Sequence, residues 1–154
     1  MSAEARPFTV TDLLQQRRAM SPCPAPDGGR LVFVVKQADL DKDANDLQLW
    51  EIPLPGGAPR QLTTAGTVNC EPAFSPDGSL LAFTSNRADG RQIWLLPAAG
   101  GEARQLTTLP GGASRAVWFP DGQRLLVISS VFADASQDAV VRERIQAGKD
   151  RKAS

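Results

Sequence analysis

The stretch "FSPDGSLLAFTSNRADGRQIWLLPAAGGEARQLTT", residues 74–108, decides the fold of this chain. It holds three short segments, "LLAFTS" at 80–85, "IWLLP" at 93–97 and "RQLT" at 104–107, separated by turn sequences. In "SPDG" the Pro suits the second position of a turn, the Asp side chain can bond the local backbone, and the Gly accepts positive φ. A second Asp-Gly pair lies in "NRADGRQ". The stretch therefore predicts short antiparallel strands joined by tight turns.

The same unit recurs along the chain. "RQLTT" stands at 60–64 and again 44 residues later, at 104–108. The flanks repeat with the same shift: Trp50 and Trp94, Pro53 and Pro97, Gly56-Gly57 and Gly100-Gly101, "PAFSPDG" at 72–78 and "AVWFPDG" at 116–122. An earlier turn, "PAPDGG" at 24–29, precedes the middle one by 50 residues, with the additional six in the polar run "DLDKDAND" at 39–46. A whole structural unit is repeated, and the insertion is a loop.

Each unit contains four strands. Strands of the type "PAF" or "AVW" precede each "PDG" turn, and the apolar runs "LVFVVK" at 31–36, "LLAFTS" at 80–85 and "LLVISS" at 125–130 follow it. Their continuous apolar character suits strands covered on both faces. The polar "RQLT" comes last, where Arg60 and Arg104 would guard an outer edge. Four-stranded units of about 40 to 45 residues are typical of β-propeller blades.

The predicted fold is all-β: a partial β-propeller with two blades and the start of a third, a short N-terminal helix and a C-terminal helical segment. The predicted divisions are a leader with a short helix (1–20), blade 1 (21–65), blade 2 (66–109), the start of blade 3 (110–133) and a helical insertion or tail (134–154). Residues before Pro24 show no blade pattern.

Both ends predict helices. In "TVTDLLQQRRAM" at 9–20, Thr9 stands three residues before Asp12, as in a capping box. Residues 136–147 read as an exposed helix, with Asp138 and Arg142 spaced for an i, i+4 pair.

The number of blades needed to close a propeller ring can be compared with the length of this chain. Propellers close with about 4 to 8 blades, and four blades of this length would need about 176 residues. An open arc would expose a blade face and strand edges. We therefore expect the chain to be the amino-terminal part of a longer protein, or to complete its ring with other chains.

The composition and net charge limit the classes of partner that can be expected. The hydrophobic fraction is 42% and the charged fraction 22%, as in ordinary soluble globular proteins. Lys plus Arg (17) equals Asp plus Glu (17), so the net charge favours neither nucleic acid nor an anionic membrane as a partner. The start "MSAEARPF" lacks a secretory pattern, which predicts a cytoplasmic location, or a periplasmic one if a signal has been removed.

Isolated residue patterns have structural explanations. Cys23 and Cys70 form no CxxC pair and are predicted to be small core residues. The acidic run Asp39, Asp41, Asp43 and Asp46 resembles a calcium loop, but it lacks the Gly and the final Glu of that motif, so a solvated loop is favoured.

Two further sets recur with the blades. Trp50, Trp94 and Trp118 allow a stacking platform, but two of them repeat at the blade period, which favours packing between blades. Asp27, Asp77 and Asp121 also repeat and are explained as turn residues. The sequence thus predicts no catalytic, cofactor-binding or metal-binding residue and no cofactor.

A family resemblance rests on three stretches. "FTVTDLLQQRRAMSPCPAPDGGRLVFVVKQADL", "LWEIPLPGGAPRQLTT" and "SPDGSLLAFTSNRADGRQIWLLPAAGGEARQLTT" together resemble the start of prolyl oligopeptidase family serine peptidases, particularly their acylaminoacyl peptidase and dipeptidyl peptidase relatives. The "FTVTDLL" leader and the "VFAD" segment with its charged helix favour that family over TolB-like propellers, which share "SPDG" and "RQLT".

The resemblance implies a seven-bladed propeller that restricts access to a carboxy-terminal α/β-hydrolase domain with a Ser-Asp-His triad. This chain has no His and no G-x-S-x-G elbow; "GGASRA" at 111–116 lacks the second glycine. None of the catalytic residues of that family can be carried over, and the chain alone is predicted to be inactive.

Two functions follow from these patterns. In the first, the chain is the substrate gate of a peptidase that hydrolyses short peptides; its partners would be the hydrolase domain of the same protein and the peptide substrate. In the second, it is a TolB-like binding scaffold without chemistry.

Overall fold

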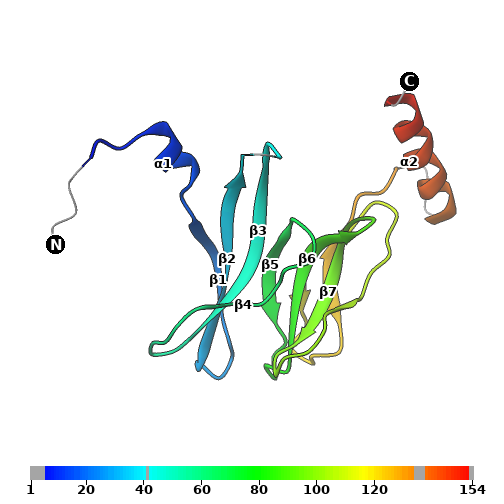
Figure 1. Ribbon diagram of the computed structural model, residues 1–154. Coiled ribbons are helices and arrows are strands. Elements are labelled where there is room, and N and C mark those ends of the chain that lie inside the picture. The colour runs from blue at the N-terminus through cyan, green and yellow to red at the C-terminus, as the bar shows by residue number, and fades with distance from the viewer. Residues whose placement is uncertain (1–5, 41, 134–137, 153–154) are drawn as a thin grey trace.

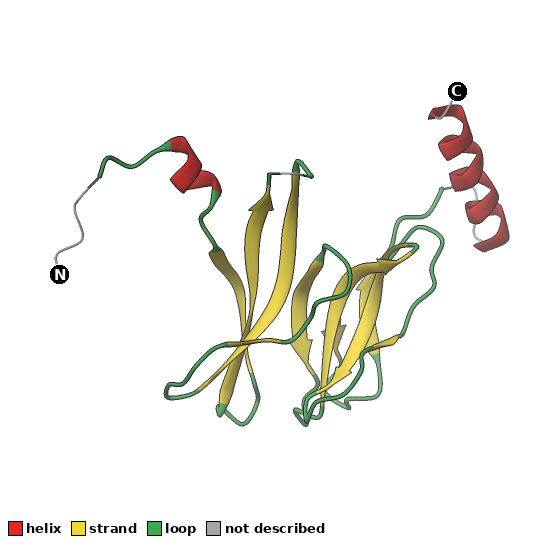
Figure 2. Cartoon of the chain, viewed as in Figure 1, coloured by secondary structure: helices red, strands yellow, loops and turns green. Residues whose placement is uncertain are grey.

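The computed structural model describes residues 6–40, 42–133 and 138–152. It contains two four-stranded antiparallel sheets, a two-stranded sheet and a helix toward each end of the chain (Figures 1 and 2). The predicted all-β partial propeller is confirmed. The first sheet, named here the first blade, contains β1 (Arg18–Pro24), β2 (Arg30–Asp39), β3 (Ala44–Pro53) and β4 (Arg60–Gln61). The second blade contains β5 (Asn69–Phe74), β6 (Leu80–Ala88), β7 (Gly90–Pro97) and β8 (Arg104–Gln105). The third blade contains β9 (Ser114–Trp118) and β10 (Leu125–Ile128).

Strand order follows the chain in each complete blade, β1-β2-β3-β4 and β5-β6-β7-β8. The registers repeat as well: Phe33 lies opposite Trp50 in the first blade, and Phe83 lies opposite Trp94 in the second. The "RQ" strands stand at the outer edge, as predicted, although each is only 2 residues long.

The "PDG" turns have the predicted chemistry. The backbone N–H groups of Gly29, Ser79 and Gln123 donate to the Oδ1 atoms of Asp27, Asp77 and Asp121 at 2.9, 3.1 and 3.0 Å. Gly78 has φ +71, a left-handed conformation that glycine adopts without a Cβ penalty. The turn role of the three aspartates is confirmed.

Threonine in each "RQLTT" extends the edge strand. Thr63 Oγ1 accepts from the Leu49 N–H at 2.9 Å and donates to Gln48 Oε1 at 2.7 Å. In the second blade Thr107 Oγ1 accepts from the Ile93 N–H and donates to Gln92 Oε1 in the same way. The repeated pentapeptide therefore satisfies buried polar groups where the two-residue strand has already ended.

Two apolar cores lie between neighbouring blades. The first core joins the first and second blades through Val32, Val34, Leu49, Leu81, Phe83 and Leu96. The second core joins the second and third blades through Ala82, Ile93, Leu95, Ala113 and Ala116. Burial of each large side chain contributes roughly 1.5 to 3 kcal/mol. Because β6 supplies residues to both cores, it is buried on both faces.

The tryptophans divide between these environments. Trp94 packs against the first core, and Trp118 packs against the second and donates from Nε1 to the Ala73 carbonyl at 3.0 Å. Trp50 is half-buried opposite Phe33 and belongs to neither core. Packing between blades is confirmed for Trp94 and Trp118 and is wrong for Trp50, because none of the described residues forms a sheet over that face of the first blade.

The amino-terminal region differs from the prediction. Helix α1 covers only Val10–Leu14, and β1 begins at Arg18 as the inner strand of the first blade. The statement that no blade pattern precedes Pro24 is therefore wrong. The side chains of β1 are almost all exposed, so the strand shows no apolar alternation, and its pairing with β2 is interrupted by a bulge between Met20 and Cys23.

The carboxy-terminal helix, α2, spans Asp138–Lys152, and the positions immediately before it lie outside the described residues. Figure 1 places α1 and α2 on opposite sides of the sheets. No helix in the described part of the chain is long and apolar enough to cross a membrane.

Candidate functional site

Among the described residues, no group of side chains forms a recognisable catalytic site. Ser114, the serine that follows the glycines at 111 and 112, lies half-buried at the start of β9. Among the described residues no three His, Cys, Asp or Glu side chains form a group that could hold a metal ion. Burial raises the pKa of the Cys23 and Cys70 thiols, which is the reverse of what activates a cysteine nucleophile.

The acidic run follows local turn geometry. Asp39 accepts from the Lys42 backbone N–H at 3.2 Å and pairs with Lys42 Nζ at 2.6 Å. Asp46 accepts from Gln48 Nε2 at 2.9 Å. Asp41 lies outside the described residues. The predicted loop over 39–46 is too long, because Asp39 ends β2 and residues 44–46 begin β3. The two strands pair as far as Asp39 and Ala44, so that only residues 40–43 connect them.

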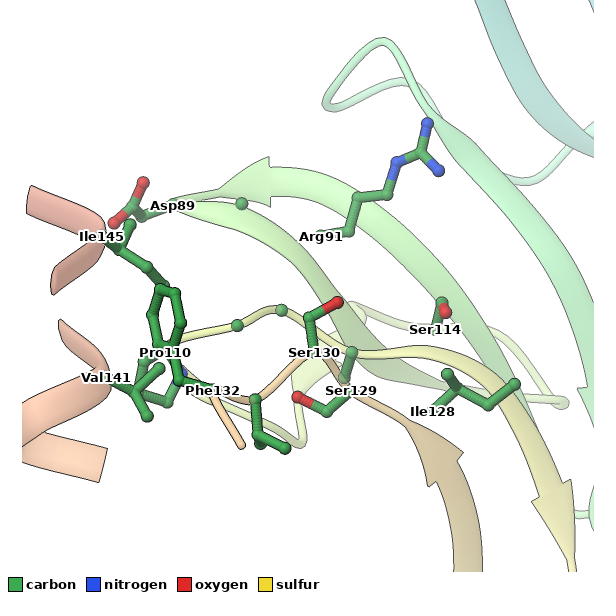
Figure 3. A pocket seen from close by; sticks show the side chains of 15 residues that line it. Asp89, Arg91, Pro110, Ser114, Ile128, Ser129, Ser130, Phe132, Val141 and Ile145 are labelled. Atoms are coloured by element: carbon green, nitrogen blue, oxygen red, sulfur yellow. The ribbon is translucent and has the colours of Figure 1, made fainter. Parts of the chain in front are cut away.

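A cleft of about 560 Å³ opens where the second and third blades meet α2. Figure 3 shows Phe132, Val141 and Ile145 grouped on one side and Ser129 and Ser130 in its middle. Its walls come from four separate segments: the β6–β7 turn, loop 110–113, the chain after β10, and α2. The apolar part of its lining comes mainly from Phe132, Val141 and Ile145.

Two contacts hold the segments of the cleft together. A Cβ added to Gly111 would lie 1.7 Å from the Ser130 carbonyl oxygen, so the two backbones meet only because residue 111 is glycine. Val141 is buried, and Arg142 Nη2 donates to the Thr108 carbonyl at 2.8 Å, so that α2 is tied to the loop between β8 and β9. The cleft can bind an apolar group beside hydroxyl donors.

The leader, defined as residues 6–17, forms a second candidate surface. Thr9 and Asp12 form the predicted capping box of α1, and Asp12 also pairs with Arg6. The hydrogen bond from Arg6 and, to a smaller extent, those from Thr9 hold the pKa of Asp12 well below its usual range. The leader exposes four apolar side chains: Phe8, Val10, Leu13 and Leu14. A locally capped segment with an uncovered apolar face suits docking to another surface.

The inner strands carry a feature that the sequence did not reveal. Ser21, Glu71 and Arg115 have φ of 52, 55 and 52, and they occupy equivalent positions in β1, β5 and β9. Glu71 Oε2 accepts from the Arg115 N–H at 2.9 Å and from Thr84 Oγ1 at 2.8 Å. The bulge turns the Glu71 carboxylate toward the next blade and links the two sheets.

The third blade presents an open face, defined by Val117, Leu126 and Ile128, which are 57, 60 and 57% exposed. Val117 and Leu126 form a cross-strand pair on this face. The equivalent of Leu126 in the second blade is Ala82, which is fully buried in the second core. The open face is therefore a surface that a neighbouring layer covers in the other blade.

These surfaces were only partly accessible to sequence reasoning. The leader and the three "PDG" turns were predicted from local motifs. The cleft was not predicted, because it is assembled from four distant segments; the only local signal was the Gly111-Gly112 pair, which permits the close approach to Ser130.

Comparisons with known proteins agree with this geometry. A family model described as TolB beta propeller domain (PD40) matches residues 11–153. Over 80 residues, or 52% of this chain, the sequence is 35% identical to "Uncharacterized peptidase YuxL" of Bacillus subtilis (strain 168).

Solved structures share the fold. Pyrococcus horikoshii acylaminoacyl peptidase superposes with a TM-score of 0.63 over 81% of this chain at 19% identity. A putative TolB from Agrobacterium tumefaciens superposes with a TM-score of 0.59 over 79% of this chain at 24% identity. The chain spans 12% of the length of the Bacillus protein, 19% of the acylaminoacyl peptidase and 41% of the TolB structure.

Proposed function

Because this chain belongs to the TolB-type β-propeller (PD40) family, we propose that it is the non-catalytic propeller portion of a serine peptidase of the acylaminoacyl peptidase type. In this role it limits the size of the peptides that enter and docks against an α/β-hydrolase domain of the same protein. The likeness to peptidase YuxL and to the acylaminoacyl peptidase propeller supports this assignment. The proposal includes a cytoplasmic location.

The observation that carries the docking role is the leader. Phe8 and Val10 are 67 and 74% exposed, although the capping box and the Arg6–Asp12 pair give the segment a defined local structure. The exposed apolar side chains of the leader do not pack against the described sheets and so do not stabilise them. Burial of these side chains against a hydrolase domain would supply the missing apolar contacts.

The test is reconstitution. A hydrolase domain encoded at the same locus would be produced separately and mixed with this chain, and hydrolysis of reporter peptides of increasing length would be followed. We expect the chain to bind the hydrolase domain and to suppress cleavage of long peptides more than that of short ones. The chain alone should neither react with a serine-directed phosphonate nor cleave the reporters.

A matched pair of variants tests the surface. Phe8→Asp with Leu13→Asp should abolish binding to the hydrolase domain, whereas Leu54→Asp, which replaces an exposed leucine remote from the leader, should not. Equal loss in both variants, or unchanged size selection on adding the chain, would contradict the proposal.

The second candidate function is a TolB-like binding scaffold. It is favoured by the superposition on the TolB structure, of which this chain covers 41%. The same mixing experiment separates the two, since a scaffold leaves the activity of any hydrolase domain unchanged.

A further inference from the structure

A small cavity lies between the first and second blades and has a volume of about 120 Å³. Its buried lining is apolar and includes three side chains of the first core, Val32, Leu81 and Leu96. Its charged lining comes from three strands of the first blade, with Arg30 on β2, Glu51 on β3 and Arg60 on β4. The loop between β7 and β8 of the second blade also lines it. The cavity therefore combines apolar and charged surfaces.

The charges that line this cavity do not balance. Glu51 Oε1 accepts from Arg60 Nε at 3.0 Å, and Glu51 Oε2 lies 3.5 Å from Arg30 Nη1. Among the described residues that line the cavity, no other is charged. Two guanidinium groups thus share one carboxylate, which leaves a positive charge without a counter-ion.

Arg30 has hydrogen-bond donors without acceptors. Its Nη1 donates to the Ala98 carbonyl at 2.7 Å, and its guanidinium carbon lies 5.4 Å from the centre of the Phe74 ring. Both contacts come from the second blade and hold the guanidinium group in place. Nε is shielded from solvent and has no partner in the described part of the chain. Nη2 has no partner there either, and it is open to solvent. A guanidinium group that is fixed in this way, with a free donor, can bind an anion.

The equivalent place between the second and third blades is apolar. The repeat aligns Arg30 with Leu80 and Glu51 with Leu95. Leu95 belongs to the second core, and Leu80 packs against it. Replacing a buried ion pair by well-packed apolar side chains is often neutral or stabilising. Packing between blades therefore does not require charges at these positions, and their presence in the first blade indicates a binding function.

We propose that this cavity binds the carboxylate of a small ligand that carries a short branched aliphatic group. The carboxylate accepts hydrogen bonds from Arg30 Nη2 and from Arg60, whose Nη groups have no partner among the described residues. The aliphatic group lies against Leu81 and Leu96. The small volume limits this group to about the size of a leucine side chain.

Two kinds of ligand share this chemistry: a free aliphatic acid and the carboxyl-terminal residue of a peptide. The inference is independent of the proposed peptidase role, because the cavity is formed by the first and second blades alone.

The binding experiment uses the whole chain and heteronuclear NMR, with isovalerate and N-acetyl-leucine as the two carboxylate probes. Both should bind saturably with dissociation constants of about 1 mM and should shift the Arg30 Nε–H signal. Tighter binding of N-acetyl-leucine would identify a peptide terminus as the ligand, and the reverse order a free acid. The neutral N-acetyl-leucinamide should bind at least about tenfold more weakly, because it lacks the charge. Equal binding of the amide, or an equal shift with inorganic phosphate, would overturn the proposal.

A matched pair of variants tests the exposed guanidinium group. Arg60→Gln should weaken binding of N-acetyl-leucine about threefold or more. Arg104→Gln is the equivalent change in the second blade, where the paired residue is Leu95 instead of Glu51, and it should leave the affinity unchanged. Thermal unfolding should be alike in the two variants, since both side chains are exposed. Unchanged affinity of Arg60→Gln, or equal loss in both, would contradict the site.

The double variant Arg30→Leu with Glu51→Leu gives the first blade the leucine pair of the second. It should unfold cooperatively on heating, as the wild type does, and should no longer bind N-acetyl-leucine. Retained binding would show that the ligand lies elsewhere. Loss of the folded state would show that the charges are required for packing, and it would equally contradict the proposal.

Discussion

The second and third blades contain the same strand in two surroundings. "LLAFTS" in β6 and "LLVISS" in β10 follow the same turn, yet residues 81–85 are all buried, whereas Leu126 and Ile128 are exposed. The difference comes from the neighbours: β6 lies between two cores, and β10 contacts one. A continuous apolar run therefore indicates that a strand can be buried on both faces. Whether both faces are buried depends on the sheets that lie beside it.

Polar contacts sharpen this difference. Between the first and second blades, Asn69 Nδ2 donates to Gln48 Oε1 at 2.9 Å, and Arg30 Nη1 donates to the Ala98 carbonyl at 2.7 Å. Between the second and third, Glu71 joins Thr84 to the Arg115 backbone. Arg115 occupies the position equivalent to Glu71 and is exposed. Both interfaces between neighbouring blades thus combine an apolar core with a polar link.

The largest effect is expected in the core of the second blade. Phe83→Ala removes a fully buried ring from the first core and should lower the free energy of unfolding by about 3 to 5 kcal/mol. The equivalent change in the third blade, Val127→Ala, removes two methyl groups from a half-buried side chain and should cost about 1 kcal/mol or less. Urea unfolding followed by tryptophan fluorescence measures both. Equal losses would contradict the difference in burial.

The link between the two blades gives the next effect. Glu71→Ala leaves the fully buried Thr84 hydroxyl without the acceptor that it has now, which should cost about 1 to 3 kcal/mol. Glu71→Gln keeps an acceptor oxygen and should retain most of the stability. The same unfolding experiment measures both variants, and indistinguishable losses would show that the carboxylate does not link the blades.

Acid should weaken the turn of the second blade. Hydrogen bonds from Ser75 and Ser79 lower the pKa of Asp77 to about 2. The unfolded value is about 3.9, so the folded state favours the ionised form; this stabilisation is full above pH about 4 and is lost as the pH falls toward 2. Thermal unfolding of the wild type and Asp77→Asn should therefore differ at pH 6 and converge near pH 2. A constant difference over that range would contradict the assignment.

The smallest change in stability is expected on the open face. Leu126→Lys places a charge where the side chain is already exposed and should alter the free energy of unfolding by no more than about 0.5 kcal/mol. The same variant should reduce binding of a hydrophobic dye and concentration-dependent self-association. Strong destabilisation would mean that the face is covered in the isolated chain.

Local motifs predicted most of the fold. The "PDG" turns, the "ADG" hairpin and the 44-residue repeat gave the strand order, because these signals depend on the φ preferences of Gly and Pro and on side chains within two residues. β1 was missed because an inner strand with exposed side chains has no apolar alternation. Helix α1 ends at Leu14 rather than continuing toward residue 20, since Arg18 already pairs with Lys36.

The candidate surfaces were less accessible. The leader was recognised from Thr9 and Asp12, but its exposure depends on what lies nearby in space. The bulges at Ser21, Glu71 and Arg115 carry three unlike residues and so leave no common motif, although the backbone repeats. The cleft depends on the crossing of Gly111 and Ser130, which are distant in sequence.

The most direct test of the arc of blades is native-state hydrogen exchange at the three equivalent strands, residues 31–36, 80–85 and 125–128. We predict that amides of β6 exchange most slowly, only by global unfolding, and that those of β10 exchange at least about tenfold faster, with β2 between them. Protection of β10 equal to that of β6 in the isolated chain would contradict the account, because it would require a covered third blade.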